Sequence, residues 1–260
     1  MAKYPAVLQV RNGSSRLKNK AMLKILKNPV LFYVIERIQS VRSISKLIVA
    51  TSKAANDDSI EQYCIKHKIK CFRGSQENVL ERIYKSIEFL EDDYFVKFWG
   101  DSILIDPYVC QNIIIQFEKK FQGFDYISNN HPSTYPEGMQ IEIIKIKALE
   151  TVYKAADLIP EDKEHVTTYL WRNTKKYKIG NVIYKENIHD QYRFVLDYPE
   201  DLEQLRKIIE SLYLTNPLFS MEDAMKFLDL HPEVKAINQM KYETEQEYNA
   251  RVYGRKKESP

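Results

Sequence analysis

The chain contains 260 residues, of which 44% are apolar, 12% aromatic and 29% charged. This balance is typical of globular proteins and excludes a disordered chain or a fibrous repeat. No apolar run approaches the roughly 20 residues of a membrane span, and the N-terminus shows no secretory signal, so we expect a cytoplasmic protein that does not bind membranes. The three cysteines are too few for a disulfide framework, which agrees with a reducing compartment.

Charge is distributed unevenly along the chain, although the formal net charge is only +3. All 36 acidic residues lie at or after Glu36, whereas residues 1–35 carry seven of the 39 basic residues. This distribution argues against a nucleic-acid-binding protein with an overall basic surface and favours one local site for an anion. The alternative is a basic surface that only faces solvent.

Apolar runs of strand length alternate with helical patterns in the first half of the chain. The predicted strands are residues 4–10, 46–51, 70–72 and 94–99. The predicted helices lie near Pro29, after a cap at Asp57 or Asp58, and after a cap at Ser75 with Val79, Ile83 and Ile87 on the buried face. This alternation predicts an α/β fold with a Rossmann-like, mostly parallel sheet, helices on both faces and a ligand site at the carboxyl ends of the strands.

The pattern changes after residue 128. Residues 140–150 alternate like a strand with one exposed face, and a helix is predicted over 164–173. Two more strands are predicted at 177–185 and 192–197, followed by a helix that starts at Pro199. We interpret residues 129–193 as a β-rich flap beside the main sheet, within a domain of residues 1–212.

Two segments follow this domain. Residues 213–240 are predicted to form a helical extension, whose last amphipathic helix is capped by Ser220. Residues 241–260 have too few apolar side chains for a core and are interpreted as a tail.

The loop after the first predicted strand, QVRNGSSRLKNK at residues 9–20, carries candidate phosphate-binding groups. Gly13 is expected to take a positive φ angle and let the backbone approach a ligand, and Ser14 supplies a hydroxyl. Its cations are Arg11, Arg16, Lys18 and Lys20. A triphosphate needs such groups while an inner phosphorus is attacked. The spacing matches neither a P-loop nor a dinucleotide-binding glycine pattern, which disfavours both of those enzyme classes.

This loop, read as R-x-G-S-x-R-L-x-x-K, resembles the signature loop of the cytidylyltransferases, which activate acidic sugars such as 3-deoxy-manno-octulosonate and sialic acid with CTP. Further matching stretches follow in the same order: VATS at 49–52, FRGS at 72–75, GDSILIDP at 100–107, TYPEG at 134–138, EHVT at 164–167 and LDYPEDLE at 196–203. The set is most similar to the spore-coat polysaccharide synthesis protein F-like branch. The likeness covers residues 5–212, and residues 219–234 resemble an extension common in that branch.

The resemblance implies roles for the matching residues. The nucleotide-binding residues would be Gln9, Arg11, Gly13, Ser14, Arg16, Lys20, Thr51, Arg73, Ser75 and Asp101. Among them Lys20, Arg16 and Asp101 would be catalytic, with Lys20 stabilising charge during the displacement. The residues around the acceptor would be Gln140, Glu142, His165 and Arg193. The family also implies that residues 129–193 take part in acceptor binding or in forming a homodimer.

Asp101 and Asp197 match the two metal ligands of the family. Carboxylates at the ends of neighbouring strands are suitable ligands for Mg²⁺, which prefers oxygen and bridges phosphates. The alternative is that Asp101 caps the turn that follows it and that Asp197 caps the helix at Pro199.

Some positions depart from the family pattern. Gln140 stands where the branch often has Asp, which removes a charge near the acceptor and leaves the acceptor's identity open. Residues usual in the branch are also replaced at Trp99, Thr168, Lys18 and Asn19.

Cys64, His67 and Cys71 have a spacing that would suit zinc if a fourth ligand came from elsewhere. Cys64 belongs to the apolar face of a predicted helix and Cys71 to a predicted strand. We therefore favour buried structural cysteines over a metal site.

Together these features predict an enzyme that joins CMP from CTP to an anionic small-molecule acceptor, either an acidic sugar or a phosphorylated or phosphonate compound, and releases pyrophosphate. One alternative is a nucleotide-sugar glycosyltransferase, although GDSI supplies only one Asp of the D-x-D motif that such enzymes commonly use. Another is a nucleotide-binding subunit without catalytic activity. The presence of Lys20, Asp101 and Asp197 argues against that last alternative.

Overall fold

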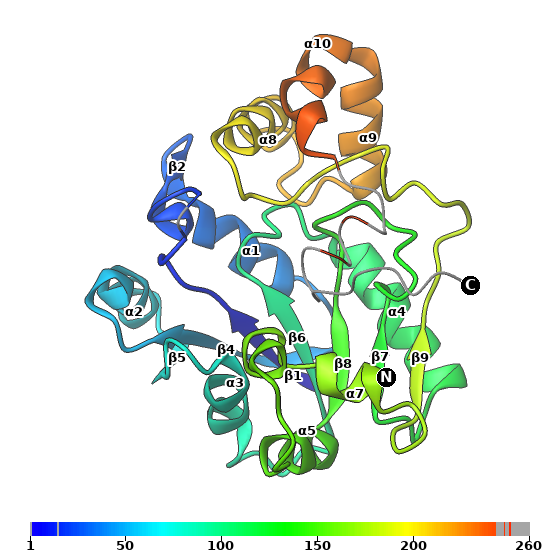
Figure 1. Ribbon diagram of the computed structural model, residues 1–260. Coiled ribbons are helices and arrows are strands. Elements are labelled where there is room, and N and C mark those ends of the chain that lie inside the picture. The colour runs from blue at the N-terminus through cyan, green and yellow to red at the C-terminus, as the bar shows by residue number, and fades with distance from the viewer. Residues whose placement is uncertain (1, 15, 243–246, 248–249, 251–260) are drawn as a thin grey trace.

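The computed structural model describes residues 2–14, 16–242, 247 and 250 and has an α/β architecture (Figure 1). The strands are β1 (Tyr4–Gln9), β2 (Lys24–Ile25), β3 (Asn28–Pro29), β4 (Ile44–Ser52), β5 (Lys70–Gly74), β6 (Tyr94–Trp99), β7 (Tyr126–Ser128), β8 (Glu142–Lys145) and β9 (Ile179–Asn181). The α-helices are α1 (Val30–Gln39), α2 (Asp58–Lys66), α3 (Val79–Ile87), α4 (Pro107–Lys120), α5 (Ile146–Tyr153), α6 (Pro160–His165), α7 (Thr168–Arg172), α8 (Pro199–Leu212), α9 (Met221–Leu230) and α10 (Pro232–Lys235). Short 3-10 helices lie at η1 (Lys20–Met22), η2 (Ala55–Asp57) and η3 (Ala236–Lys241).

Seven strands in the described part of the chain form one sheet in the order β5-β4-β1-β6-β8-β7-β9. β8 is antiparallel to β6 and to β7, and the remaining neighbours in the sheet run parallel. The predicted mostly parallel sheet is therefore confirmed. Because β1, β4 and β6 run in the same direction, the loops that follow them open at the same edge of the sheet.

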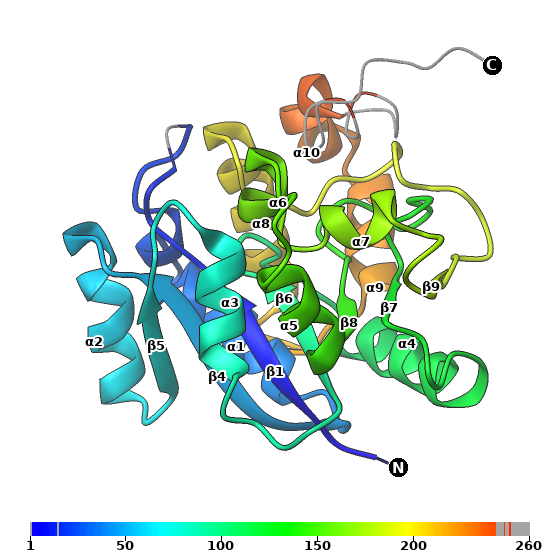
Figure 2. The ribbon, with the colours of Figure 1, turned by 60° about the horizontal axis from the view of Figure 1, so that its bottom comes forward.

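The central strands send alternate side chains to opposite faces of the sheet. In β1, Ala6 and Leu8 pack into one core with α1 and α4, whereas Val7 packs into a second core with α3 and α5. Figure 2 shows α3 and α5 in front of the sheet and α1 behind it. Helices thus cover both faces, as predicted. Val79, Ile83 and Ile87 are fully buried, which confirms the predicted inner face of α3.

The region around β8 differs from its prediction. Only Glu142–Lys145 is a strand, α5 begins at Ile146, and β8 lies between β6 and β7 in the main sheet. Glu142, Ile143 and Ile144 are all buried, because a strand inside a sheet with helices on both faces has no exposed side. The interpretation of 129–193 as a β-rich flap beside the sheet is therefore wrong in placement: this segment adds β8 and β9 to the sheet and also contains α5, α6 and α7.

Three smaller predictions are corrected as well. The expected helix at 164–173 is divided into α6 and α7 at Val166, whose φ angle of 63° is left-handed. Of the expected strand at 177–185 only β9 forms, and residues 192–197 contribute a single bridge between Arg193 and Glu137. Asn78, not Ser75, caps α3, by accepting a hydrogen bond from the Glu81 amide at 3.0 Å.

The predicted helical extension packs beside α8, where Figure 1 shows α9 and α10. Ser220 caps α9, as predicted, by accepting a hydrogen bond from the Asp223 amide at 3.1 Å. Most of the predicted tail at 241–260 lies outside the described residues. Within the part of the chain that is described, no helix combines the length and the apolar character that crossing a membrane requires.

The carboxylate of Asp106 joins the extension to the sheet domain. Asp106 is fully buried and caps α4 by accepting a hydrogen bond from the Tyr108 amide at 2.6 Å. Its second oxygen accepts from the amide of Met221, the first residue of α9, also at 2.6 Å. Burial raises the pKa of Asp106, while its backbone hydrogen bonds act in the opposite direction. One carboxylate therefore organises the starts of two helices.

We expect Asp106→Ala to lower the free energy of unfolding by about 2 to 3 kcal/mol, because it removes one helix cap and leaves the buried Met221 amide without its partner. Asp223→Ala, which removes an exposed cap contact of α9 alone, is the matched control and should cost about 1 kcal/mol or less. Urea unfolding of both variants measures the difference. Equal losses would contradict a stabilising link between α4 and α9.

Candidate active site

A cavity of about 450 Å³ opens at the carboxyl ends of β1 and β6, where an α/β sheet is expected to bind its ligand. Its walls come from the loop after β1, the segment after β6, residues 137–140, the end of α6 and residues 195–197. The lining residues are Gln9, Val10, Arg11, Gly13, Ser14, Arg16, Lys20, Trp99, Gly100, Asp101, Ser102, Glu137, Gln140, Glu164, His165, Val195 and Asp197. Ten of the predicted site residues are therefore brought together around one cavity.

The loop after β1 is anchored to the end of β4 by Asp57. The Asn12 amide donates a hydrogen bond to Asp57 at 2.7 Å, and the other Asp57 oxygen accepts from the amide and the hydroxyl of Ser52. Asp57 was predicted as a possible cap of α2, but its side chain makes no cap hydrogen bond there. It holds the basic loop against the end of β4 instead.

The backbone of this loop also differs from its prediction. Gly13 does not adopt a positive φ angle, and a Cβ atom there would meet nothing closer than the Asn56 side chain at 3.6 Å. Among the described residues of the loop, Asn19 is left-handed, with a φ angle of 55°. The Ser14 hydroxyl, which lines the cavity, accepts a hydrogen bond from the Leu17 amide at 3.3 Å.

The ammonium group of Lys20 lies between two carboxylates. Lys20 Nζ is 2.9 Å from an oxygen of Asp101 and 2.9 Å from an oxygen of Asp197, and it also donates to the Leu196 carbonyl at 3.0 Å. Burial acts to lower the pKa of Lys20, but Asp101 and Asp197 more than offset this effect, so the pKa is raised. Lys20 is therefore a fixed positive charge at the floor of the cavity.

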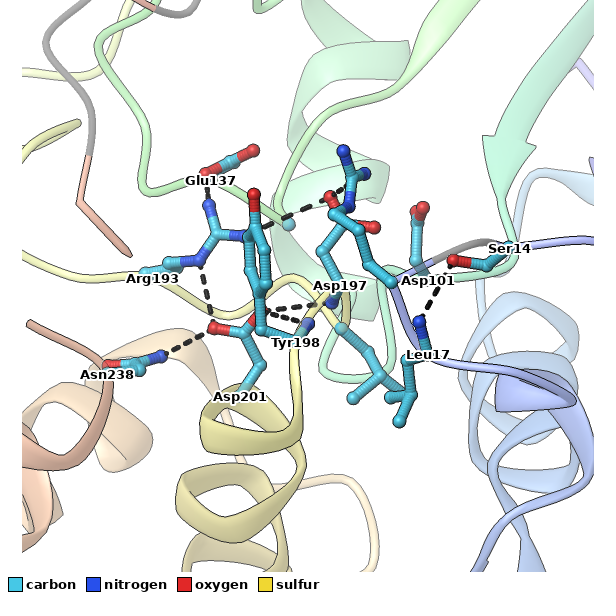
Figure 3. A network of polar contacts seen from close by, with 12 residues as sticks. Ser14, Leu17, Asp101, Glu137, Arg193, Asp197, Tyr198, Asp201 and Asn238 are labelled. Atoms are coloured by element: carbon cyan, nitrogen blue, oxygen red, sulfur yellow. Dashed lines mark hydrogen bonds and ion pairs between the residues drawn. The ribbon is translucent and has the colours of Figure 1, made fainter. Parts of the chain in front are cut away.

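Asp197 is paired with a second cation. Arg16 donates to its other oxygen at 2.8 Å, and the Arg16 side chain is still 39% exposed, so it can reach a ligand in the cavity. Burial works against ionisation of Asp197, yet Lys20 and Arg16 lower its pKa to about 2. Asp197 thus remains negatively charged throughout the physiological range. Figure 3 shows Asp197 beside Asp101 above the start of α8.

Arg11 joins two walls of the cavity. It forms an ion pair with Glu164 at 2.7 Å, in which both side chains are more than one third exposed. Glu164 can readily be exchanged for another anion, because solvent weakens an ion pair that is this exposed. Arg11 therefore remains available to a bound phosphate.

Arg193 lies behind the cavity wall rather than in it. Its guanidinium group is only 2% exposed and contacts Glu137, which does line the cavity, and Asp201, which is fully buried. Burial acts to lower the pKa of Arg193, but Glu137 and Asp201 raise it. Arg193 was predicted to contact the acceptor, but in this structure it is buried and supports Glu137, which lines the cavity.

Glu142 also lies below the cavity surface. It pairs with Lys97 on the neighbouring strand at 2.8 Å, and both side chains are almost completely buried. It further accepts hydrogen bonds from the hydroxyls of Tyr126 and Thr167, each at 2.7 Å. Thr167 lies two residues after His165, which lines the cavity. Through its bond to Thr167, Glu142 therefore supports the turn that contains His165, and it does not itself line the cavity.

Gln140 lines the cavity, but its amide group is used within its own turn. It accepts a hydrogen bond from the Gly138 amide at 2.7 Å and donates to the Pro136 carbonyl at 3.2 Å. Gly138 has a φ angle of 98°, and a Cβ atom there would lie 2.6 Å from the Phe194 backbone. Gln140 therefore shapes the acceptor side of the cavity without adding charge to it.

Three predicted nucleotide-binding residues do not line the cavity. Thr51 is fully buried at the end of β4. Arg73 forms ion pairs with Asp58 and Glu61 of α2, and the hydroxyl of Ser75 accepts a hydrogen bond from the Asn78 amide. In this structure Arg73 and Ser75 therefore make local contacts around α2 and α3, and their predicted roles in nucleotide binding remain predictions.

Some residues that line the cavity were not predicted as site residues, namely Val10, Trp99, Gly100, Ser102, Glu137, Glu164 and Val195. Glu137 and Glu164 stand inside the TYPEG and EHVT stretches, which therefore contained a usable signal. Position 100 requires glycine because the backbone passes close to Val10: a Cβ atom there would lie 2.5 Å from the Val10 side chain.

Asp101 and Asp197 fit the donor set of a Mg²⁺ site. Both carboxylates approach the same ammonium group, so they converge on one point beside the cavity. Asp101 is 26% exposed and Asp197 is 9% exposed. Mg²⁺ is commonly held in proteins by one or two carboxylates together with water and substrate phosphates, which is the chemistry that this pair offers.

The stretch that contains Cys64, His67 and Cys71 packs as an ordinary part of the fold. Cys64 is fully buried, Cys71 is half-buried, and the His67 ring stacks on Tyr63 with their centres 4.2 Å apart. Across residues 2–14, 16–242, 247 and 250, no group of three or more His, Cys, Asp or Glu side chains is arranged to hold a metal ion.

Comparison with known proteins agrees with this geometry. A family model for cytidylyltransferases matches residues 6–242. The spore coat polysaccharide biosynthesis protein SpsF of Bacillus subtilis (strain 168) is 27% identical over 232 residues, which cover 87% of this chain and 94% of that protein. A 3-deoxy-manno-octulosonate cytidylyltransferase from Escherichia coli is 22% identical over 223 residues, which cover 83% of this chain and 85% of that protein.

A solved structure supports the same assignment. A cytidylyltransferase from Leptospira borgpetersenii serovar Hardjo-bovis (strain JB197) superimposes with a TM-score of 0.83 at 26% identity, covering 90% of this chain and 97% of that one. The resemblance predicted from the sequence motifs is thereby confirmed. A basic loop at the end of the first strand, two carboxylates on one lysine and a family match over nearly the whole chain lead to one conclusion: the chain belongs to the cytidylyltransferase family and is a nucleotidyltransferase.

Proposed function

We propose that this chain transfers CMP from CTP to an acidic sugar or to a phosphorylated or phosphonate acceptor and releases pyrophosphate. The observation that carries the proposal is the ammonium group of Lys20, held between Asp101 and Asp197 at the floor of a cavity that Arg11 and Arg16 also line. Preorganised charges of this kind stabilise charge that develops on a phosphate. We further propose that the reaction serves the synthesis of surface polysaccharides or glycoconjugates, a role supported by the names of the SpsF and 3-deoxy-manno-octulosonate relatives.

In the proposed reaction an oxygen of the acceptor attacks the α-phosphorus of CTP. The new bond joins the acceptor oxygen to this phosphorus, and the bond to the oxygen of the β-phosphate breaks. Lys20 and Arg16 offset the negative charge on the departing pyrophosphate, and Arg11 exchanges Glu164 for a phosphate oxygen. Catalysis rests mainly on positioning and electrostatics. Mg²⁺ at Asp101 and Asp197 would neutralise and orient phosphate oxygens when bound.

The acceptor side of the cavity is the part near Trp99, Gln140 and His165. A volume of about 450 Å³ lies within the range of roughly 300 to 1,000 Å³ typical of small-molecule sites. His165 offers a polar contact for an anionic acceptor, and Gln140 gives this wall a neutral amide where the branch often has a carboxylate. The neutral amide of Gln140 adds no repulsion against an anionic acceptor on this wall.

The proposal includes a homodimer and a cytoplasmic location, both expected from the family resemblance. Light scattering or sedimentation of the purified protein tests the first. A monomer across the micromolar range would remove the dimer from the proposal and leave the chemistry untouched.

The proposed activity is tested by pyrophosphate release from CTP in the presence of Mg²⁺. Candidate acceptors are acidic sugars, phosphosugars, phosphonates and small phosphorylated acids, each assayed also without acceptor. We expect release that depends on CTP and on one of these acceptor classes. Release of inorganic phosphate instead, or none with any acceptor, would contradict the proposal.

Replacing Asp101 or Asp197 with Asn keeps the size of the side chain and most of its capping ability but removes the charge. We expect each variant to lose most turnover while its melting temperature changes little, and the double variant to be hardly worse than either single one, because both carboxylates serve one function. Steady-state kinetics over a Mg²⁺ titration measures this. If both carboxylates are only caps, the single variants will keep near-normal rates and lose at most about 1 kcal/mol of stability.

Lys20→Ala is expected to reduce kcat far more than it weakens CTP binding, because the charge that Lys20 offsets is largest in the transition state. Lys18→Ala is the matched control, since Lys18 is an exposed cation of the same loop. Turnover assays combined with calorimetric titration of CTP separate the two effects. Equal turnover in Lys20→Ala and the parent would remove Lys20 from the mechanism.

A further inference from the structure

A buried carboxylate behind the cavity connects the site to the C-terminal extension. Asp201, in the first turn of α8, is fully buried. One of its oxygens accepts hydrogen bonds from the amides of Asp197 and Tyr198, each at 2.9 Å. Its other oxygen accepts from Arg193 Nε at 2.9 Å and from Asn238 Nδ2 at 3.0 Å (Figure 3). Asp201 therefore fixes the backbone that carries the metal-ligand candidate Asp197.

Arg193 extends this contact to the cavity wall. It binds both oxygens of Asp201 and also donates to the carboxylate of Glu137. Its Nη2 atom lies 3.9 Å from an oxygen of Asp197. Glu137 and Asp197 both line the cavity, so the position of one buried guanidinium group sets the position of two carboxylates in the site.

The extension contributes Asn238 of η3 to this network of hydrogen bonds, and the orientation of the Asn238 side-chain amide is fixed. Its side-chain oxygen accepts a hydrogen bond from Gln204 Nε2 at 2.6 Å. Because Gln204 uses a nitrogen for this bond, the nitrogen of the Asn238 amide is turned toward Asp201. Asn238 is fully buried, which excludes solvent as a ready replacement donor.

The charge balance explains why a neutral donor suits this position. Three carboxylates, those of Glu137, Asp197 and Asp201, surround the single positive charge of Arg193. A cation in place of Asn238 would compete with Arg193 for Asp201 and alter the field at Asp197. An apolar residue would leave one Asp201 oxygen bound only to Arg193 and draw that side chain away from Glu137.

The same segment reaches the basic loop. Lys241 Nζ lies 4.5 Å from the centre of the Tyr198 ring, and the guanidinium carbon of Arg16 lies 5.2 Å from that centre. The 3-10 helix η3, which also carries Asn238, and the basic loop thus both contact Tyr198, the residue that follows Asp197.

We propose that Asn238 is a positioning residue for nucleotidyl transfer: through Asp201 it holds Arg193, and thereby the carboxylates of Glu137 and Asp197, in their working positions. This inference rests on the proposed function. It gives the C-terminal extension a role in the reaction beyond covering apolar surface.

The test compares Asn238→Ala with Val234→Ala in the full chain. Val234 is a buried apolar residue of the same extension whose side chain cannot form a hydrogen bond, so its truncation reports loss of packing. Asn238→Asp is a second variant of the same size that keeps the acceptor for Gln204 but places a like charge against Asp201. Each variant is assayed well below its melting temperature for kcat, for KM of CTP, and for hydrogen exchange of the backbone amides of Asp197 and Tyr198.

We expect Asn238→Ala and Asn238→Asp to lower kcat by about tenfold or more while KM for CTP changes by less than about threefold, since the ground-state contacts of CTP are largely kept. Exchange of the Asp197 and Tyr198 amides should quicken in both variants. Val234→Ala should keep kcat within about twofold of the parent and leave that exchange unchanged.

Two results would overturn the inference: equal losses of kcat in Asn238→Ala and Val234→Ala, or unchanged exchange at Asp197 and Tyr198 in both Asn238 variants. A parent protein that releases no pyrophosphate with any acceptor would contradict the proposed function instead. In that case the exchange measurement alone still decides whether Asn238 positions this backbone.

Discussion

The arrangement of the site depends on one buried positive charge between two negative ones. The ammonium group of Lys20 joins Asp101 and Asp197, which lie 96 positions apart in the sequence, and offsets the repulsion between these two carboxylates. Lys20 begins η1, Asp101 follows β6 and Asp197 precedes α8. Because β1 and β6 run parallel, Lys20 and Asp101 come to the same edge of the sheet. Asp197 reaches this edge in the segment that leads into α8.

Three parts of the cavity are each supported by a more deeply buried polar group. Asp57 anchors the loop after β1. The buried pair of Lys97 and Glu142 supports the turn that contains His165. Asp201, together with Arg193, holds the backbone of Asp197 in place. Such support keeps the reacting groups in place, because a site without a fixed surrounding shell is too loose for catalysis. It also explains why several residues that the family resemblance assigned to substrate contact lie behind the cavity instead.

Much of the site could be predicted from the sequence, because its central residues directly follow recognisable strands. Lys20 and Asp101 belong to loops that the strand pattern places at one edge of the sheet. The depth of Glu142 could not be predicted because it depends on β8, whose burial on both faces no alternation reveals. The depth of Arg193 could not be predicted because its contacts with Glu137 and Asp201 form only in the folded chain. The ion pairs of Arg73 could not be predicted because its acidic partners on α2 become neighbours only when that helix packs on β5. Glu137 was missed because its partner Arg193 is 56 residues away.

The central claim is that the chain cleaves CTP between the α- and β-phosphates and passes CMP to an acceptor. Parallel reactions with CTP labelled at the α- or at the γ-phosphate test it most directly. The account predicts that the α label is recovered in a new acceptor conjugate and the γ label in pyrophosphate, in equal amounts. Recovery of the γ label as inorganic phosphate, or of the α label as free CMP whatever acceptor is present, would contradict it.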